Sequence, residues 1–336
     1  MAKELLKVEG LKKYFPIKGG FLGNTVNYVK AVDDITFTVC EGETVSLVGE
    51  SGCGKSTAGR TILRLEEPTA GKIIFNGSDL STLPKKKLRE IRKDMQIVFQ
   101  DPFASLNPRQ TVSQILQEAL HIQNIVPPQS RKLRAVELLE TVGLAAYQAD
   151  RYPHEFSGGQ RQRIGIARAL ALNPKLIICD EAVSALDVSI RAQILNLLKK
   201  LQQDFRLTYL FISHDLGVVR HISDRVIVMY LGQIVEIADK IALFEKTRHP
   251  YTAALLSAIP VPKPGGKRER IVLSGDVPSA IDPPEGCRFH TRCPYVEEKC
   301  RSEQPALRPL DDTDPGHLSA CHFFESIFSR QTGINR

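Results

Sequence analysis

The chain has 336 residues, of which 42% are hydrophobic and 25% are charged, and its formal net charge is +7. This balance is typical of globular proteins with a sizeable core, and it excludes a wholly disordered chain. The longest stretch without Asp, Glu, Lys or Arg is His249–Pro262, which has 14 residues and contains three prolines. A membrane-spanning helix needs about 20 mostly apolar residues. The first residues also lack an apolar export signal, so we expect a soluble intracellular protein.

The length predicts about two domains. The basic residues are scattered among acidic ones, so the charge alone does not choose between nucleic acid, an anionic membrane surface and a phosphate-rich ligand. A mildly basic solvated surface explains the charge equally well.

Hydrophobic periodicity predicts alternating strands and helices from about residue 5 to 245, as in an α/β domain. Helices are expected over Ser130–Val142 and over Val188–Leu201, where apolar residues at spacings of four, three and four form one face. The segment Pro260–Arg268 is basic and rich in Pro and Gly, which predicts a linker. Short strands are predicted at Thr44–Val48, Lys72–Phe75, Leu176–Cys179, Thr208–Ile212 and Arg225–Tyr230.

The segment Gly49–Ser56 fits the phosphate-binding pattern G-x-x-x-x-G-K-[ST]. It follows a predicted strand and precedes a helical pattern at Thr57–Leu65, which is the context that the pattern requires, so a fortuitous glycine-rich turn is disfavoured. Backbone N–H groups of such a loop surround phosphates, and the following helix presents its positive end. We expect Lys55 to contact the β- and γ-phosphates and Ser56 to ligate Mg²⁺.

Two further segments fit phosphate chemistry, although each is a weak signal alone. The strand Leu176–Cys179 ends in Asp180 and Glu181, which could hold Mg²⁺ and polarise an attacking water, respectively. Two acids at a strand end are often merely solvated. The turn Ser157–Gln160 opens a helical run and is a second potential anion site.

Taken in chain order, these segments resemble the motifs of the nucleotide-binding subunit of an ABC transporter. The resemblance implies an α/β fold, namely an ABC-type P-loop nucleotide-binding domain with a RecA-like core, an antiparallel β subdomain and a helical subdomain at about 101–165. It assigns residues 1–255 to this domain and residues 256–336 to a linker and a small Cys-rich C-terminal extension. The matching residues are Phe15, Gly49–Ser56, Gln100, Ser157–Gln160, Asp180, Glu181, Ser184–Asp187 and His214.

The resemblance also implies the role of each residue. Glu181, His214 and Gln100 are the expected catalytic residues, and Ser56, Gln100 and Asp180 are the expected Mg²⁺ site. Ser157 and Gly159 are expected to complete the ATP site of a second subunit. The expected ATP-binding residues are Phe15, Tyr14, Gly49, Glu50, Ser51, Gly52, Cys53, Gly54, Lys55, Ser56, Thr57, Gln100, Ser157, Gly158, Gly159, Gln160, Asp180 and Asp187.

Two details qualify this match. An aromatic residue near the N-terminus stacks on adenine in the family, and the alignment favours Phe15 with Tyr14 second. The proline that usually follows the catalytic glutamate is Ala182 here, which removes a backbone restraint but no functional group.

Three segments extend the resemblance to the peptide and nickel importer subfamily, and Gly159–Arg163 is closer to its F-type subunit than to its D-type subunit. The resemblance implies an ATPase that drives uptake of di- or oligopeptides through two separate permease subunits. It also implies a second ATPase subunit (a D-type partner or a second copy), an extracytoplasmic substrate-binding protein, and a peripheral place on the cytoplasmic face of the membrane. Nickel or another small solute stays open as the substrate. The three segments are Gln100–Arg109, Arg248–Thr252 and Gly275–Ser279.

Phe103 and Leu106 are candidates for the groove that receives a permease helix, with burial in the helical subdomain as the alternative. A nucleic-acid ATPase of the repair type is a rival interpretation. Repair-type ATPases insert a long coiled coil between the phosphate loop (Gly49–Ser56 here) and the turn Ser157–Gln160. Only 100 residues without a long heptad run separate these two segments, which argues against the repair type. Because that argument disfavours the repair type, we expect no nucleic-acid partner. A non-catalytic metal-binding module is disfavoured because every hydrolytic role is filled.

Four of the seven cysteines lie near the C-terminus, in the pattern C-x5-C-x6-C-x20-C. Four thiolates suit zinc or an iron–sulfur cluster, but zinc sites usually have closer pairs, and the peptide-importer extension that this region resembles is associated with a [4Fe–4S] cluster. Four free thiols, or disulfides formed in air, are the alternative. The expected cluster ligands are Cys287, Cys293, Cys300 and Cys321, with His290, His317 and His322 as competing ligands.

Overall fold

The computed structural model describes residues 3–19, 24–259, 270–309 and 314–332. The chain divides into two compact units. The predicted linker at 260–268 lies outside the described residues. The first unit comprises Met1–Leu6, Val39–Thr44 and Phe75–Ser213, and the second comprises Lys7–Thr38, Val45–Ile74 and His214–Arg336.

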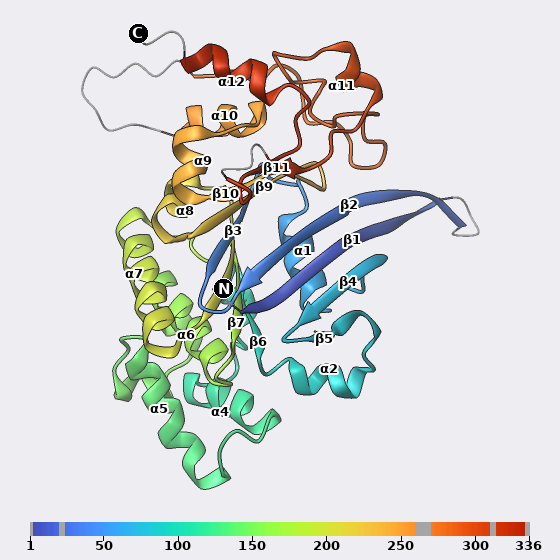
Figure 1. Cartoon of the computed structure of the whole chain (residues 1–336). Helices are drawn as coiled ribbons and strands as arrows, with labels where there is room; N and C mark the ends of the chain where they lie inside the picture. The colour runs from blue at the N-terminus through green and yellow to red at the C-terminus, as the bar shows by residue number, and fades with distance from the viewer. Residues whose placement is uncertain (1–2, 20–23, 260–269, 310–313, 333–336) are drawn as a thin grey trace. The chain divides into compact units, whose positions relative to one another are not determined.

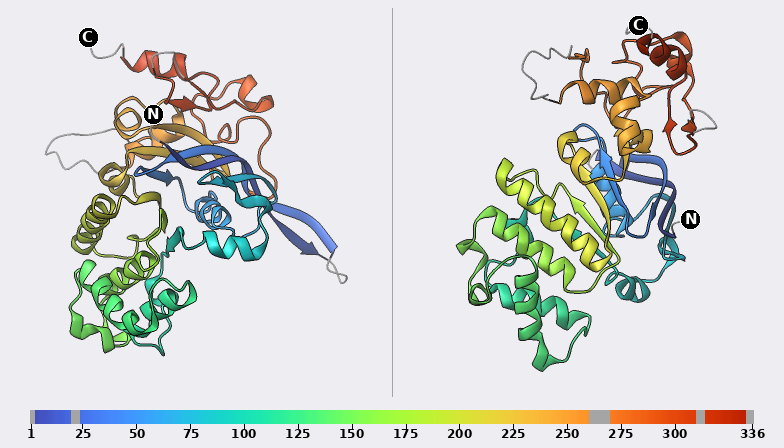
Figure 2. Two further views of the ribbon diagram at one scale, coloured as in Figure 1. Left: turned by 60° about the horizontal axis from the view of Figure 1, so that its bottom comes forward. Right: turned by 60° about the vertical axis from the view of Figure 1, so that its left-hand side comes forward.

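Parallel strands in the order β8-β7-β6 form the centre of the first unit. Every residue of β7 is buried, as expected for a strand that is covered on both faces. The helices between residues 112 and 205, green to yellow in Figure 2, lie together in this unit. The strands are β5 (Ser78–Asp79), β6 (Met95–Val98), β7 (Leu176–Asp180) and β8 (Thr208–Ser213). The helices are α2 (Lys85–Ile91), α3 (Pro102–Ser105), α4 (Val112–Ile122), α5 (Arg131–Thr141), α6 (Gly158–Leu170) and α7 (Val188–Phe205), with 3₁₀ turns η1 (Leu80–Thr82), η2 (Pro128–Ser130), η3 (Ala146–Asp150) and η4 (Pro153–Glu155).

Helix α7 shows how the sequence pattern becomes structure. Three residues of the predicted apolar face, Ile194, Leu197 and Leu201, are buried, so the face is confirmed there. The first residue of the predicted face, Ile190, is only partly buried. The helix continues four residues beyond the prediction because the left-handed residue Arg206 (φ 53°), rather than a break in the apolar pattern, ends it.

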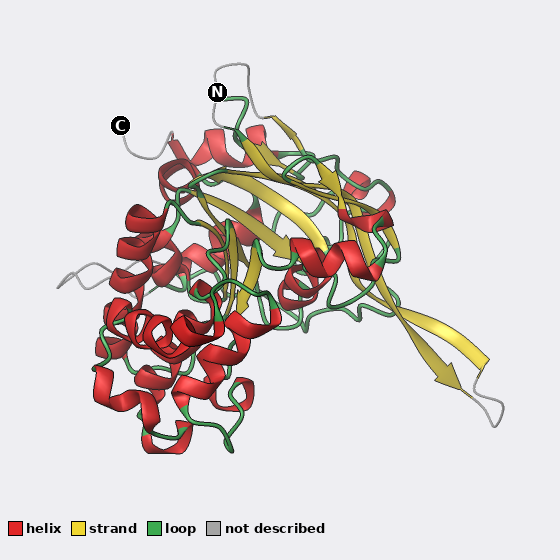
Figure 3. Cartoon of the chain, turned by 90° about the horizontal axis from the view of Figure 1, so that it is seen from below, coloured by secondary structure: helices red, strands yellow, loops and turns green. Residues whose placement is uncertain are grey.

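The second unit contains strands in the order β11-β12-β10-β9-β3 and a further group in the order β2-β1-β4. Strand β3 pairs with β9 in parallel, and β10 pairs with β9 in antiparallel fashion. Strands β1 and β2 run side by side as a long ribbon (Figures 1 and 3). The strands are β1 (Glu4–Gly19), β2 (Asn24–Cys40), β3 (Thr44–Val48), β4 (Ala70–Phe75), β9 (Arg225–Tyr230), β10 (Gln233–Asp239), β11 (Arg308–Pro309) and β12 (Leu318–Ser319). The helices are α1 (Lys55–Ile62), α8 (Leu216–Ile222), α9 (Lys240–Lys246), α10 (Pro250–Ser257), α11 (Glu298–Ser302) and α12 (Phe324–Thr332).

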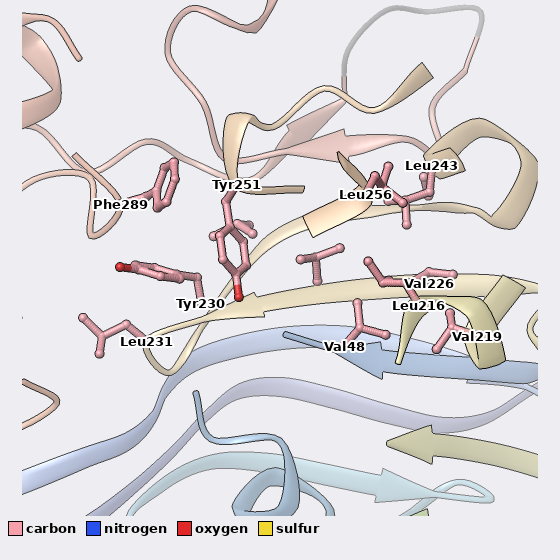
Figure 4. Close-up of a cluster of buried hydrophobic side chains, with 13 residues drawn as sticks. Val48, Leu216, Val219, Val226, Tyr230, Leu231, Leu243, Tyr251, Leu256 and Phe289 are labelled. Atoms are coloured by element: carbon pink, nitrogen blue, oxygen red, sulfur yellow. The ribbon is translucent and has the colours of Figure 1, made fainter. Parts of the chain in front are cut away.

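The C-terminal region is built into the second unit. Strand β12 extends its sheet by pairing with β10, with Ser319 opposite Glu236. Phe289 is 1% exposed and lies with Tyr230 and Tyr251 in a hydrophobic cluster (Figure 4). Phe324 of α12 belongs to a smaller cluster that packs against α10. Among the described residues, no helix combines the length and the apolar character that crossing a bilayer demands.

Candidate functional site

The loop between β3 and α1 is shaped by close backbone contacts. Gly54 precedes the first residue of α1 with φ 103°, and an added Cβ there would lie 2.0 Å from the carbonyl oxygen of Ala31 in β2. Only glycine combines this backbone angle with this approach. The first turn of α1 has no side-chain cap, so its backbone N–H groups can bind an anion such as phosphate.

Lys55 turns its ammonium group into this loop. Its Nζ donates to the carbonyl oxygens of Gly49 and Glu50, both at 2.8 Å, and lies 3.6 Å from Sγ of Cys53. Lys55 is 4% exposed, so a positive charge is held among backbone groups where water is scarce. A phosphate at this loop would contact both the ammonium group of Lys55 and the N-terminus of α1. This arrangement suits the phosphate chain of a nucleotide.

Glu50 is held from two sides by the C-terminal half of the chain. Its backbone N–H donates to Oη of Tyr251 at 2.8 Å. Its carboxylate accepts two hydrogen bonds from the guanidinium of Arg292, at 2.7 and 3.2 Å. These hydrogen bonds to Glu50 raise the pKa of Arg292, so the guanidinium stays charged opposite the carboxylate. The phosphate loop is therefore braced by residues 201 and 242 positions further along the chain.

Tyr14 and Phe15 are placed differently on β1. The phenol of Tyr14 donates to Asp33, which also accepts a hydrogen bond from Arg288. Burial and Asp33 together raise the pKa of Tyr14 to about 12. Burial alone would raise the pKa of Asp33, but Tyr14 and Arg288 outweigh it and the net shift is downward. Neighbouring strand residues point to opposite faces, so Phe15, with Lys13 Nζ 4.6 Å from its ring centroid, lies on the other side of β1.

The first unit brings Gln100 and Glu181 together. Nε2 of Gln100 donates to Oε2 of Glu181 at 2.9 Å. Glu181 has φ 48°, and Asp180 beside it is 1% exposed at the end of β7. Carboxylate and amide oxygens are ligands that Mg²⁺ favours, so the side chains of Gln100 and Asp180 are chemically suited to the expected cation.

The turn Ser157–Gln160 begins α6 through a reciprocal cap. Ser157 Oγ accepts from the backbone N–H of Gln160 at 3.4 Å, and the Gln160 side chain accepts from the backbone N–H of Ser157 at 3.0 Å. Gly159 packs closely on α7, because an added Cβ would lie 2.4 Å from Cγ2 of Ile190. Gly158 has more room, since its added Cβ would lie 3.7 Å from Leu186. Asp187 precedes α7 without a side-chain cap hydrogen bond.

The expected site residues fall into two sets, one in each unit. The first unit holds Gln100, Ser157–Gln160, Asp180, Glu181 and Asp187, and the second holds Tyr14, Phe15, the phosphate loop with Thr57, and His214. Contacts within each set are given above. The two groove candidates separate clearly, because Phe103 is 51% exposed with Arg161 over its ring, whereas Leu106 is 3% exposed and belongs to the core.

The four C-terminal cysteines are neighbours in the structure. The backbone N–H of Cys287 donates to the carbonyl oxygen of Cys300 at 2.8 Å. Burial raises the pKa of Cys321 to about 12, and the other three thiolates add to that rise. Burial likewise raises the pKa of Cys287 and of Cys293 to about 11.

No group of three or more His, Cys, Asp or Glu residues is arranged to hold a metal ion in the part of the chain that the structure describes. The expected iron–sulfur cluster therefore has no ready-formed ligand set there. The competing histidines have other contacts: His317 Nε2 lies 2.8 Å from Glu236, His290 Nδ1 lies 2.9 Å from the carbonyl of Cys287, and His322 Nε2 lies 2.9 Å from the carbonyl of Glu303.

Sequence reasoning missed the two arginines that reach this site. Arg288 and Arg292 are the direct sequence neighbours of Cys287 and Cys293, and the sequence pattern assigned a function only to the cysteines. The sequence signal that could have indicated these two arginines is that each is adjacent to a cysteine within one short segment. The partner acids, Asp33 and Glu50, lie more than 200 positions away, so no local pattern could have paired them.

Comparison with known proteins finds relatives that match nearly the whole chain. Residues 32–184 match the ABC transporter family, and residues 235–300 match the family "Oligopeptide/dipeptide transporter, C-terminal region". The oligopeptide transport ATP-binding protein AppF of Bacillus subtilis is 56% identical over 323 residues, covering 95% of this chain and 97% of its own length. The putative oligopeptide transport ATP-binding protein YkfD of the same organism is 50% identical, covering 97% of this chain and 98% of its own length.

Solved structures show the same fold. A dimeric ATP-binding cassette in a post-hydrolysis state, bound to ADP and phosphate, superposes with a TM-score of 0.63 at 31% identity. The match covers 70% of this chain and 99% of that cassette. The expected ABC-type α/β fold is confirmed by this similarity.

Proposed function

Because the chain belongs to the ABC transporter family, and within it to the ATP-binding subunits of oligopeptide and dipeptide transporters, we propose that it drives uptake of di- and oligopeptides through separate permease subunits. The match of residues 235–300 to the transporter C-terminal region carries this proposal. The same match disfavours a repair-type ABC ATPase. The chain also matches the two relatives described above, named as oligopeptide transport ATP-binding proteins, over nearly their whole length.

We assign the chemistry to phosphoryl transfer from ATP to water. Lys55 and the N-terminus of α1 bind the phosphates. Ser56, Gln100 and Asp180 are the residues that the family resemblance assigns to Mg²⁺, and they would hold a cation that would neutralise charge on the phosphates. Glu181 orients the attacking water and takes up its proton, while Gln100 keeps the carboxylate in place. His214 completes the catalytic group by its place in the motif order.

We propose that adenine stacks on Phe15. The phenol of Tyr14 is engaged by Asp33, which ties that ring to the opposite side of β1. This leaves Phe15 as the aromatic side chain of this strand available for a base.

The working ATPase is proposed to be a pair. Ser157 and Gly159 would complete the site of the second subunit, which is a D-type partner or another copy. The pair would bind two permease subunits on the cytoplasmic face of the membrane, and the exposed ring of Phe103 is the proposed contact for a permease helix. Residues 1–255 act in this scheme as the nucleotide-binding domain, and residues 256–336 act as its extension.

Co-expression with permease and binding-protein subunits of a peptide importer tests this function. We expect a salt-resistant membrane complex that takes up a labelled dipeptide only when ATP is present. Phe103→Ala should lower uptake while ATP affinity is unchanged, and Phe205→Ala, which changes another exposed ring, should leave both unchanged. Co-purification with nucleic acid, together with no membrane association, would favour the repair-type function.

We also propose that Cys287, Cys293, Cys300 and Cys321 hold a [4Fe–4S] cluster. The support is their mutual proximity, and the three nearby histidines each contact another group. The thiols are neighbours rather than a finished ligand set, so binding would include ordering of their side chains. A bound cluster would pin together a segment that has few apolar residues.

Anaerobic purification followed by iron, acid-labile sulfide and zinc analysis tests this cluster. We expect four iron atoms per chain and a brown protein, with iron lost when each cysteine is replaced by serine in turn. Cys40→Ser, which lies outside the group, is the matched control. Stoichiometric zinc in a colourless protein, or full iron in all four serine variants, would contradict the proposal.

A further inference from the structure

The seven-residue segment Cys287–Cys293, called here the arginine loop, is anchored in the core of the second unit. Phe289 at its centre packs against Tyr230 and Tyr251, with ring centroids 5.2 and 5.4 Å away (Figure 4). Burying an aromatic ring of this size contributes about 1.5–3 kcal/mol. The loop is therefore held firmly enough to present its two arginines in fixed positions.

Arg292 neutralises an acid inside the phosphate loop. Its guanidinium makes a two-pronged ion pair with Glu50, and the two side chains are 8% and 28% exposed. Pairs of this geometry, shielded from water, interact more strongly than surface pairs. Glu50 follows Gly49 at the start of the phosphate loop, so without Arg292 its negative charge would repel the phosphates that the loop binds.

Arg288 acts at a different place. It donates to Asp33 and to the carbonyl oxygen of Leu231, and Asp33 also accepts the phenol of Tyr14. The link continues through the backbone. The N–H of Asp33 donates to Gly232, whose own N–H donates to the carbonyl of Cys53 in the phosphate loop, at 2.8 and 3.0 Å. Arg288 thus fixes strand β1, which carries Phe15, relative to the phosphate loop.

We propose that Arg292 and Arg288 are positioning residues of the nucleotide site, Arg292 on the phosphate side and Arg288 on the base side. The Cys-rich extension is then a working part of that site. This inference rests on the proposed assignment of Gly49–Ser56 as the phosphate loop and of Phe15 as the base-stacking residue.

The two roles produce different ligand dependence. Inorganic tripolyphosphate needs only the phosphate loop, whereas ADP needs the phosphate loop and the stacking residue. Arg292→Ala should weaken both ligands. Arg288→Ala should weaken ADP and leave tripolyphosphate unchanged, a distinction that general destabilisation of the fold would not produce.

The experiment measures dissociation constants of the full-length chain for ADP and tripolyphosphate by isothermal titration calorimetry, with thermal melting to verify folding. We expect losses of about tenfold, in the usual range of coupling between two sites. Arg301→Ala, an exposed arginine of the same region, is the matched control and should bind both ligands as wild type does.

Rescue separates the charge effect from simple loss of structure. Glu50→Gln combined with Arg292→Ala removes both charges and should restore tripolyphosphate affinity to within about twofold of wild type, because no unpaired acid is left in the loop. Arg292→Lys keeps the charge but loses the two-pronged geometry, so its affinity should lie between wild type and Arg292→Ala.

Two results would overturn the proposal: unchanged tripolyphosphate affinity in Arg292→Ala, or equal losses for both ligands in Arg288→Ala. If Arg292→Ala does not fold, Arg292→Gln decides, since it also removes the charge and wild-type tripolyphosphate affinity there contradicts the proposal. Lys55→Ala tests the underlying assignment separately. Normal phosphate binding in that variant would reject the phosphate loop itself, whereas weak binding there with normal binding in Arg292→Ala rejects only the role of the arginine.

Discussion

The amide of Gln100 donates to the carboxylate of Glu181 across 2.9 Å. Gln100 lies just beyond β6 and Glu181 just beyond β7, and these two strands pair in parallel, so their ends meet at one edge of the sheet. The segment that follows Gln100 contains the exposed ring of Phe103. A movement of that segment would therefore reach the Glu181 carboxylate through a single hydrogen bond.

Replacing Glu181 by Gln should stop hydrolysis while ATP still binds. The substitution keeps the size of the side chain but removes the carboxylate that is proposed to orient water and accept its proton. Loss of a general base typically lowers turnover by about 10²–10⁴-fold. Phosphate release and ATP affinity should be measured together, and size-exclusion chromatography with ATP should reveal a trapped dimer. Normal turnover would remove Glu181 from the role of base.

Lys55→Ala should act on binding itself. The ammonium is buried in the loop and donates to two carbonyl groups, so no other side chain replaces its charge at that position. A hydrogen bond to a charged group contributes about 1.5–3 kcal/mol, which corresponds to about 10- to 100-fold in affinity. Titration with ATP measures this loss. Lys93→Ala, an exposed lysine, should bind ATP normally, and equal affinities for the two variants would contradict the assignment.

Gly159→Ala should destabilise the first unit by about 1–3 kcal/mol, because the new methyl group would collide with Ile190 of α7. Urea unfolding measures the change. Gly158→Ala is the matched control, since its methyl group has room. Adding Ile190→Ala to Gly159→Ala should recover the stability. If that stable double variant still lacks ATPase activity, Gly159 also has a role beyond packing, as expected for a residue that completes a partner's site.

His249 makes the stability of the second unit depend on pH. Burial lowers its pKa to about 4, so the folded protein keeps it neutral while the unfolded chain, with a pKa near 6.5, takes up a proton. The free energy of unfolding should therefore fall as pH drops from about 6.5 to 4, by up to about 3 kcal/mol, and this contribution should level off below pH 4. His249→Asn keeps a side-chain acceptor for the N–H of Tyr251 at the start of α10. Denaturant unfolding at several pH values should show a shallower slope for this variant, and identical slopes would be evidence against His249.

Local patterns predicted the parts of the fold that local physics determines. The strands Thr44–Val48 and Arg225–Tyr230 match their predictions to the residue, because each is a mostly apolar run that a turn-forming glycine follows within two residues. The ribbon of β1 and β2 was not predicted as two long strands, because much of it is only partly buried and has no clear alternation.

The candidate site divides in the same way. The phosphate loop follows from spacing within eight residues, and its backbone contacts bear out the need for glycine at Gly54. The brace on Glu50 joins residues 242 positions apart, and only the folded chain brings them together. The proposal that Phe15 rather than Tyr14 faces a base likewise rests on Asp33, a tertiary contact of Tyr14.

The bond between Glu50 and Arg292 also orders events during synthesis. The ribosome synthesises the phosphate loop early, whereas Arg292, which neutralises Glu50 of that loop, is added 242 residues later. Contacts of such sequence separation form late, because the intervening chain must be made and folded first. A nascent chain, or a protein cut short before residue 292, would therefore carry the phosphate loop with an uncompensated negative charge. Full nucleotide affinity would mark a polypeptide that has been made past Arg292.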